Sequence, residues 1–197
     1  MERAILARHG ESEFSARRYV NGDVTVAVAL TEQGVEEAQL LAAEIARDEI
    51  DLCATSEFER TKQTADIALG GRDVPRVVIP ELNDPRYGEY EGGPLDAYLE
   101  WAHAHGSREV PPGDGEARHA IAGRYAAGFR KVLERPERTV LVVAHSLPLA
   151  YVLMSLEGDG PAPKARLIEH AKAYRLTAEE LERAVERIEA WCAAPTW

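Results

Sequence analysis

The sequence predicts an α/β fold, a three-layer αβα sandwich with a largely parallel central sheet. Short apolar runs alternate with helical patterns along nearly the whole chain, and this alternation is typical of parallel sheets that helices cover on both faces. The 197 residues suffice for one domain with a sizeable core. Because no repeat, linker or low-complexity segment divides the chain, we expect a single domain over residues 1–197.

Apolar runs mark the expected strands. The run at residues 139–145, TVLVVAH, is the most strand-like in the chain. The run at 24–30, VTVAVAL, fits either a strand or an extended loop, and residues 165–176 fit two short strands or a hairpin. The other expected strands are residues 3–7, 51–55 and 76–80.

Capping residues and apolar stripes mark the expected helices. The last helix has the strongest signal, because Thr177 and Glu180 form a capping box ahead of an apolar stripe that includes Leu181 and Ile188. The other expected helices are residues 31 to about 48 with Thr31 as N-cap, 56–69 with Ser56 as N-cap, 94–105, 116–134 and 147–156. Glycine- and proline-rich segments predict loops at 81–93, 110–116 and 158–163.

Composition narrows the functional classes. Apolar residues make up 45% of the chain and charged residues 29%, and the formal net charge is −11 at pH 7. Such an acidic protein is a poor partner for nucleic acid or for an anionic membrane, so we expect neither. No apolar stretch approaches a membrane span, and the N-terminus does not have the pattern of a signal peptide. Cys53 and Cys192 fit reduced thiols in a cytoplasmic protein.

Two histidines directly follow expected strands. His9 comes after the first strand and His145 after TVLVVA. In open α/β sheets, ligands bind outside the carboxyl ends of the strands, so both histidines are candidate site residues, although each alone could simply be a polar residue that closes a strand. His103 and His105 could suggest a metal pair, but residues two apart on a helix do not face each other. No metal site is therefore expected.

Arginines near these histidines predict a phosphate pocket. Arg8 precedes His9, and Gly10 follows it and allows a close backbone approach. Arg60 lies early in an expected helix, where a guanidinium can clamp an oxyanion. Two arginines and two histidines at strand ends would concentrate positive potential within an acidic protein. No phosphate-binding glycine motif competes with this interpretation.

These residues belong to segments that resemble a known family. Arg8-His9-Gly10-Glu11 resembles the signature of the histidine phosphatase superfamily, the phosphoglycerate mutase-like proteins, and the resemblance implies their αβα fold. Further segments resemble the family's other motifs in order: LTEQG (30–34), the second-arginine motif ATSEFERTKQTA (54–65), the proton-donor motif LNDPRYGEYEG (82–92) and the second-histidine motif VLVVAHSLPLAYVL (140–153).

The chain also departs from the family pattern. Asp84 stands at the proton-donor position, where the family has glutamate. Ser15 stands where the family often has an asparagine that touches the phosphate, and Ser146 replaces the common glycine after the second histidine. No proline precedes the LT of LTEQG.

The resemblance implies a role for each catalytic residue. His9 would attack phosphorus and form a phosphohistidine, and Arg8 and Arg60 would keep its imidazole neutral. The two arginines and a protonated His145 would bind the phosphate oxygens. Asp84 would protonate the leaving oxygen and later take a proton from water. Neither a metal nor a cofactor would be needed.

Several assignments stay open at this point. Glu81, Glu89 and Glu91 share the loop of Asp84, and Glu89 is the next candidate for the proton donor. Glu11 could orient the pocket arginines or simply be a charge in the first turn of a helix. Residues 21–23 read first as a turn and second as a substrate loop. The expected substrate-binding residues are Gly10, Glu11, Ser15, Gly22 and Ser146.

The leading functional prediction is a phosphomonoester hydrolase that acts on a small phosphorylated metabolite or binds inorganic phosphate. A phosphoglycerate mutase is the alternative within the family, and it is disfavoured because residues 85–144 are short and hold few clustered bases. A non-catalytic phospho-ligand binder and a phosphatase of phosphoproteins are further alternatives. The sequence leaves open whether the chain forms a homodimer.

Overall fold

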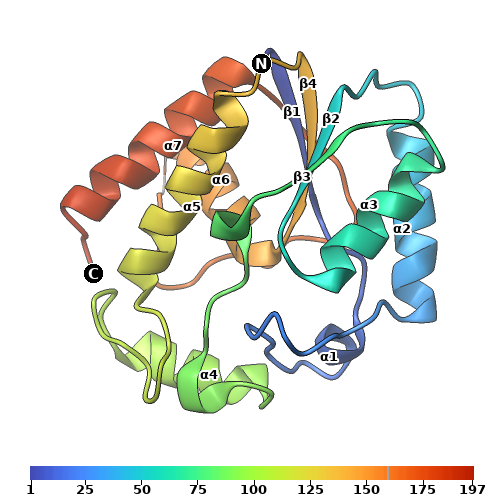
Figure 1. Ribbon diagram of the computed structural model, residues 1–197. Helices are drawn as coiled ribbons and strands as arrows, with labels where there is room; N and C mark the ends of the chain where they lie inside the picture. Colours follow the sequence, from blue (N-terminus) through green and yellow to red (C-terminus); the bar gives the residue numbers. More distant parts are fainter. Residues whose placement is uncertain (159) are drawn as a thin grey trace.

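The molecule is built around a five-stranded sheet that lies between two layers of helices (Figure 1). The computed structural model describes residues 1–158 and 160–197. The strand order is β3-β2-β4-β1-β5. Neighbouring strands from β3 to β1 are parallel, and β5 is antiparallel to β1. The predicted α/β sandwich with a largely parallel sheet is confirmed.

The strands are β1 (Arg3–Arg8), β2 (Leu52–Thr55), β3 (Arg76–Val78), β4 (Thr139–Ala144) and β5 (Tyr174–Thr177). Residues 24–30 form no strand, and only Leu30 makes an isolated bridge, to Ser12. Of the two alternatives predicted for residues 165–176, the hairpin is wrong, whereas the second of the two short strands is present in part as β5. Residues 168–171 instead lie beside the carboxyl end of β1, where His170 makes an isolated parallel bridge to Arg8, and β5 pairs with the preceding part of β1, Arg3 to Leu6.

Most predicted helices are confirmed within a few residues. Thr31 caps α2 by accepting a hydrogen bond from the backbone N–H of Gly34, although α2 ends at Glu44, before residue 48. The capping box of Thr177 and Glu180 is present at α7. The helices are α1 (Glu13–Ala16), α2 (Glu32–Glu44), α3 (Glu59–Leu69), α4 (Leu95–Ala104), α5 (Arg118–Leu133), α6 (Ser146–Glu157) and α7 (Ala178–Ala193).

One capping prediction is wrong. Phe58, and not Ser56, is the N-cap residue of α3. The hydroxyl of Ser56 is directed to other partners at the carboxyl end of β2, where it belongs to the candidate site described below. Two short 3-10 turns, η1 (Pro80–Leu82) and η2 (Gly88–Tyr90), interrupt the predicted loop at 81–93. The predicted loop at 158–163 includes residue 159, which lies outside the described residues.

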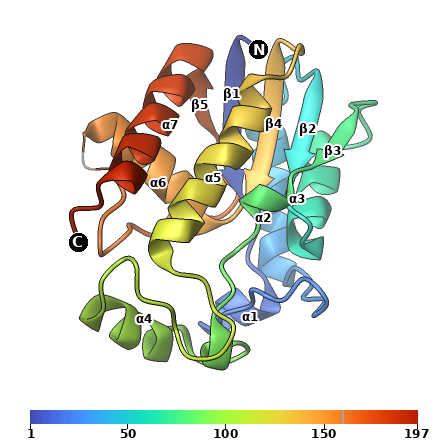
Figure 2. The same cartoon turned by 60° about the vertical axis from the view of Figure 1, so that its left-hand side comes forward.

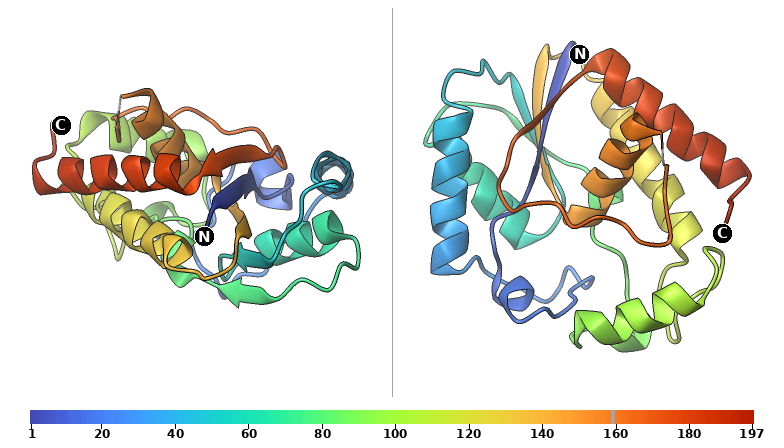
Figure 3. Two further views of the ribbon diagram at one scale, coloured as in Figure 1. Left: turned by 90° about the horizontal axis from the view of Figure 1, so that it is seen from above. Right: turned by 180° about the vertical axis from the view of Figure 1, so that it is seen from behind.

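Successive side chains of each central strand pack alternately against the two layers of helices. In β1, Ala4 and Leu6 pack with α5, α6 and α7, whereas Ile5 and Ala7 pack with α2 and α3. Figures 2 and 3 show these two helical layers on opposite faces of the sheet. Burial on both faces explains why the central strands read as continuous apolar runs. In the described part of the chain, no helix is long and apolar enough to cross a membrane.

Candidate active site

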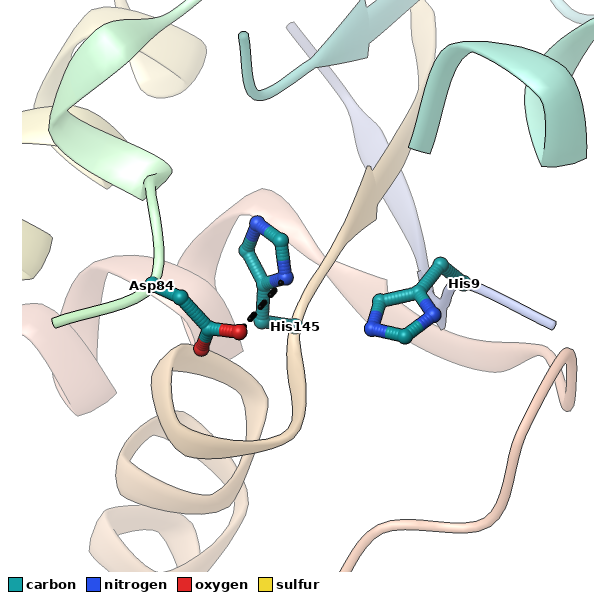
Figure 4. A group of neighbouring side chains, drawn as sticks. All are labelled: His9, Asp84 and His145. Atoms are coloured by element: carbon teal, nitrogen blue, oxygen red, sulfur yellow. Dashed lines mark ion pairs between the residues drawn. The ribbon is translucent and has the colours of Figure 1, made fainter. Parts of the chain in front are cut away.

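The candidate site lies where β1 and β4 end side by side. These strands pair in parallel with Arg8 opposite Ala144, so the next residues, His9 and His145, come together. Their ring centroids lie 5.3 Å apart in an edge-to-face arrangement, and their exposed fractions are 3% and 0%. Figure 4 shows the side chains of His9, His145 and Asp84 gathered at this edge. The sheet topology therefore brings the two predicted histidines together.

Arg60 connects the groups of the site. It lies in the first turn of α3, is 4% exposed, and its guanidinium carbon lies 4.1 Å from the ring centroid of Phe58. Its Nε donates to His9 Nε2 at 3.2 Å and its Nη1 donates to Asn21 Oδ1 at 2.6 Å. Its Nη2 forms an ion pair with Asp84 Oδ2 at 2.8 Å. Its Nη2 also lies 3.3 Å from His145 Nδ1, so one guanidinium contacts four polar side chains.

The hydrogen bonds of His9 define its tautomer. Nδ1 lies 2.7 Å from the carbonyl oxygen of Gly10, and since a carbonyl only accepts, Nδ1 carries the proton. Nε2 accepts from Arg60, so its lone pair points into the site. Burial, followed by the positive charges of Arg60 and Arg8, holds the pKa of His9 well below its ordinary value. His9 is therefore a neutral imidazole at neutral pH, and its nucleophilic Nε2 accepts a hydrogen bond from Arg60 in the ligand-free protein.

Asp84 and His145 form a coupled pair. Asp84 Oδ2 lies 3.1 Å from His145 Nδ1. Burial raises the pKa of Asp84, but His145 and Arg60 outweigh it and hold that pKa below its ordinary value. Burial is also the largest influence on His145 and lowers its pKa to about 4, although Asp84 opposes it. Asp84 is therefore a carboxylate and His145 a neutral imidazole in the ligand-free protein at neutral pH.

The remaining pocket arginine, Arg8, keeps a donor available. Its Nη1 donates to the carbonyl oxygen of Ile168 at 2.8 Å. Its Nε is buried and has no hydrogen-bond partner among the described residues. Burial lowers the pKa of Arg8 to about 10, so it stays charged at neutral pH. A buried, charged and unsatisfied donor is suited to a phosphate oxygen.

Sequence reasoning missed two hydroxyl groups behind His145. Ser56 Oγ lies 2.9 Å from His145 Nε2 and 3.0 Å from Thr61 Oγ1. Thr61 in turn donates to the carbonyl oxygen of Phe58 at 2.8 Å. Ser56 and Thr61 are fully buried. The position of Ser56 directly after β2 was the available signal, because β2 ends at the same edge of the sheet as β1 and β4.

Two further neighbours were missed. His170 donates from Nδ1 to the backbone carbonyl of His9 at 2.8 Å, and the two ring centroids lie 5.6 Å apart. Asn21 accepts from Arg60, and it was considered only within a segment that read first as a turn and second as a substrate loop. His170 lies in the segment that was predicted as a hairpin, so its position could not be inferred before the path of that segment was known.

Two glycines are required by close packing around the site. A Cβ atom on Gly10 would lie 2.3 Å from the carbonyl oxygen of Gly34, and one on Gly22 would lie 1.8 Å from the carbonyl oxygen of Pro85. Real Cβ atoms do not approach oxygen so closely, so neither position accepts a side chain without a backbone shift. The structure therefore gives Gly10 and Gly22 a packing role beside the site.

The other predicted binding residues have local partners. The Glu11 carboxylate accepts from the Thr31 hydroxyl at 2.8 Å, and in the described part of the chain it forms no ion pair with an arginine. Ser15 shares the capping box of α1 with Ser12. Ser146 Oγ accepts from the backbone N–H of Ile168 at 3.0 Å. These three side chains thus support the segments that surround the site.

The charge around the histidines favours an anion over a metal cation. The ligand atoms of His9, Asp84 and His145 lie within 4.8 Å of one another, which is close enough to hold a metal ion. However, Arg60 covers the Nε2 lone pair of His9 and pairs with Asp84. A cation here would also lie beside a guanidinium, and the two charges would repel. An oxyanion fits this donor set better.

Comparisons with known proteins show what the chain as a whole is similar to. Residues 4–193 match the family described as the histidine phosphatase superfamily (branch 1). A 2,3-bisphosphoglycerate-dependent phosphoglycerate mutase of Methylobacterium sp. is 34% identical over 80% of this chain and 82% of that protein. An adenosylcobalamin/alpha-ribazole phosphatase of Salmonella typhimurium is 37% identical over an alignment that covers 45% of this chain and 43% of that protein. The alpha-ribazole phosphatase structure from Shigella flexneri superposes with a TM-score of 0.75, at 27% identity, over 88% of this chain and 89% of that one.

Proposed function

The chain belongs to the histidine phosphatase superfamily, and from this premise we propose that it is a metal-independent phosphomonoester hydrolase that acts on a small phosphorylated metabolite. The observation that carries the proposal is the fixed tautomer of His9, whose Nε2 lone pair faces the Nε–H of Arg60. A phosphate that takes over the donors of Arg60 would bring its phosphorus next to that lone pair. The similarity to relatives that include adenosylcobalamin/alpha-ribazole phosphatases supports the activity.

In the first step, the lone pair of His9 Nε2 forms a bond to phosphorus while the bond from phosphorus to the alcohol oxygen breaks. The electron pair of that bond goes to the alcohol oxygen, which takes a proton from Asp84. Arg8, Arg60 and His145 bind the three other phosphate oxygens. The product is an alcohol and a phosphohistidine on His9.

Asp84 must gain a proton before it can donate one. In the ligand-free protein, Arg60 stabilises its carboxylate. A bound phosphate takes contacts of Arg60 and adds negative charge nearby, and both changes raise the pKa of Asp84. Asp84 takes this proton from solvent or from the monoanion of the bound ester, so that His145, 3.1 Å away, can keep its own proton for the phosphate. Charge on the bound phosphate also raises the pKa of His145, so the protonated form that binds phosphate develops only in the complex.

In the second step, water attacks phosphorus and the bond from phosphorus to nitrogen breaks. The electron pair returns to His9 Nε2, and Asp84 takes the proton that the water releases. Asp84 is better placed to donate a proton than Glu89, the next candidate from the sequence. Its oxygen contacts Arg60 and His145, whereas the Glu89 side chain is exposed and only its backbone is held, by Pro112.

A mutase is the second candidate, and the 34% identity to a phosphoglycerate mutase is the observation that favours it. A mutase returns the phosphoryl group from histidine to a second phosphoglycerate, whereas a phosphatase passes it to water. The two activities are separated by following phosphate release and phosphoglycerate isomerisation in one sample.

We further propose a cytoplasmic location, on the ground that Cys53 and Cys192 are free thiols.

The test is to trap the intermediate. The protein is mixed with a labelled aryl phosphate in EDTA, quenched in base and digested, and the phosphorylated peptide is mapped. We expect hydrolysis in EDTA and the label on His9. Label on His145 or a serine, or complete loss of hydrolysis in EDTA with recovery on addition of a divalent ion, would contradict the proposed mechanism.

A further inference from the structure

A cavity of about 440 Å³ opens beside Asp84. Asp84 is the one group of the proposed reaction that lines it, since His9, Arg8, Arg60 and His145 are not part of its wall. If Asp84 protonates the leaving oxygen, the alcohol part of the ester extends into this cavity. The cavity wall therefore selects the alcohol, while the arginines behind Asp84 select the phosphate.

The cavity wall is strongly acidic. Two of its carboxylates are neutralised by arginine, since Asp84 pairs with Arg60 and Glu116 pairs through both oxygens with Arg124, at 2.9 and 2.8 Å. The other lining carboxylates form no ion pair among the described residues: Asp23, Glu57, Glu91 and Asp114. The lining arginine without an ion pair in the same set of residues is Arg86. The wall thus carries an excess of negative charge.

Glu91 is held in place within this wall. Its Oε1 accepts from the backbone N–H of Gly22 at 2.7 Å and from that of Asp23 at 3.3 Å. Its Oε2 has no hydrogen-bond partner in the part of the chain that the structure describes. Because the first oxygen is fixed by two backbone donors, the second can receive a ligand without a large loss of side-chain entropy. Glu91 is also only half-buried, so a ligand can reach it.

The two halves of the substrate space are therefore of opposite charge. Arg8 and Arg60 lie in the phosphate half, and the unpaired carboxylates lie in the alcohol half. A carboxylate or second phosphate on the alcohol would face repulsion in the cavity, whereas a cation would be attracted. Opposite charges in contact at a protein surface attract each other more strongly than they do in bulk water, so the wall can discriminate between substrates.

We propose that the natural substrate is the phosphate monoester of an alcohol that carries a positive charge, such as an amino alcohol or a quaternary ammonium alcohol. This inference rests on the proposed phosphatase function, because it assigns the cavity to the leaving alcohol. The ammonium group lies against Glu91 and its neighbouring carboxylates while the phosphate lies on Arg8 and Arg60. Phosphoglycerates, whose alcohol bears a carboxylate, are poor substrates on this basis.

The test compares three phosphate esters with the same two-carbon framework. O-phosphoethanolamine ends in an ammonium group, ethyl phosphate in a methyl group and 2-phosphoglycolate in a carboxylate. We expect kcat/KM to fall in that order, with at least about a tenfold span between the first and the last. The span should shrink as salt is raised, because salt screens charges at an open site. A flat or reversed order at low salt would overturn the proposal.

Matched variants identify the charge that is responsible. Glu91→Gln keeps an oxygen that can accept from Gly22 but removes the negative charge, and we expect it to lower the preference for the ammonium ester over ethyl phosphate several-fold. Glu89→Gln is the control, because Glu89 is in the same loop but does not line the cavity. An unchanged preference in Glu91→Gln together with Asp114→Asn would also overturn the proposal.

Failure of the proposed function gives a different result. Hydrolysis of an aryl phosphate in EDTA with no charge preference leaves the phosphatase function intact and rejects the cationic alcohol. If no ester is hydrolysed, the phosphatase function is rejected instead. Calorimetric binding of the three esters to a His9→Asn variant then still decides the charge preference: tighter binding of O-phosphoethanolamine supports it, and equal or weaker binding overturns it.

Discussion

His9 and His145 differ in how strictly their hydrogen-bond partners fix their protonation state. His9 has one fixed state, because Nδ1 faces the carbonyl of Gly10, which only accepts, and Nε2 faces the guanidinium of Arg60, which only donates. The partners of His145 are different. The Ser56 hydroxyl can donate or accept, and Asp84 can hold or release a proton, although Arg60 Nη2, which only donates, also lies 3.3 Å from His145 Nδ1.

This difference matches two chemical tasks. A nucleophile needs a permanent lone pair, which the surroundings of His9 provide. A proton-transfer unit needs partners that accommodate both protonation states, which the surroundings of His145 provide. When His145 is neutral with its proton on Nδ1, Ser56 can donate to Nε2, and when His145 is an imidazolium, Ser56 can accept from Nε2 and donate to Thr61. Arg60 is the link between the two halves.

Removing Arg60 breaks both halves and should have the largest effect. Arg60→Ala removes the donor to His9 and the partner of Asp84, so we expect kcat/KM on an aryl phosphate to fall by about 10³- to 10⁵-fold, as for other phosphate-stabilising arginines. Arg130→Ala is the control, because Arg130 forms surface ion pairs with Glu182 and Glu189. Thermal unfolding checks that both variants fold. Retention of activity within about tenfold would contradict the central role of Arg60.

Substitution of Asp84 should impair proton transfer to the leaving group but not the attack of His9 on phosphorus. Asp84→Asn should slow hydrolysis of an alkyl phosphate by about 10²- to 10⁴-fold, because an alkoxide needs a proton to leave. Formation of phosphohistidine from a nitrophenyl phosphate should be affected much less. Single-turnover rates on both esters measure the difference. The same dependence in Glu89→Gln, and not in Asp84→Asn, would make Glu89 the acid.

Acid should destabilise the fold through the buried neutral histidines. Burial lowers the pKa of His145 to about 4 in the folded protein, against about 6.5 in the unfolded chain. The unfolded chain therefore binds more protons as the pH falls from 6.5 to 4, and the free energy of unfolding falls over this window. The loss from His145 is at most about 3 to 4 kcal/mol. His9 acts with the same sign.

The measurement for this prediction is the thermal midpoint between pH 7 and pH 4. The decrease should be smaller in His145→Gln than in the unmodified protein. His103→Gln, which changes an exposed histidine, should not reduce it comparably. Equal decreases in all three proteins would show that His145 is not a source of the acid sensitivity.

Removing the Ser56 hydroxyl, which contacts His145, should have the smallest effect on activity. It is also the most specific test of the difference between His145 and His9. Ser56→Ala leaves His145 Nε2 without its partner, at a cost typical of one buried hydrogen bond, and we expect kcat to fall about tenfold. The acidic limb of the pH–rate profile should shift, since the imidazolium loses an acceptor. Thr61→Val, which reaches His145 only through Ser56, should have a weaker effect. An unchanged kcat and pH profile in Ser56→Ala would remove the proposed role.

Local pattern predicted most of the fold. The strands that carry His9 and His145 and the helices with clear caps were found, because buried strands and capping boxes have signatures within a few residues. The position of β5 was not found, because pairing with β1 depends on a contact between segments far apart in the chain. Ser56 was misread for a related reason. A serine before a helix is a typical cap, but a buried histidine from another strand competes for its hydroxyl.

The residues of the candidate site also fall into two groups, those that could be predicted from the sequence and those that could not. His9, Arg60 and His145 could be gathered from the rule that parallel strands end at one edge, and Asp84 came from the family motif. His170 and Asn21 could not be predicted, because each reaches the site through the path of a loop. The charge of the cavity beside Asp84 was equally hidden, since its carboxylates come from segments that meet only in the folded chain.

Both edges of the sheet are short, and this limits how copies of the protein can associate. The edge strands β3 and β5 have three and four residues, against six in β1 and β4. Prolines stand close to either end of β3, at Pro75 and Pro80, and supply no N–H for further pairing. The sheet therefore offers little template for extension by a second chain. A dimer of this protein would have to be built from its helical faces or loops.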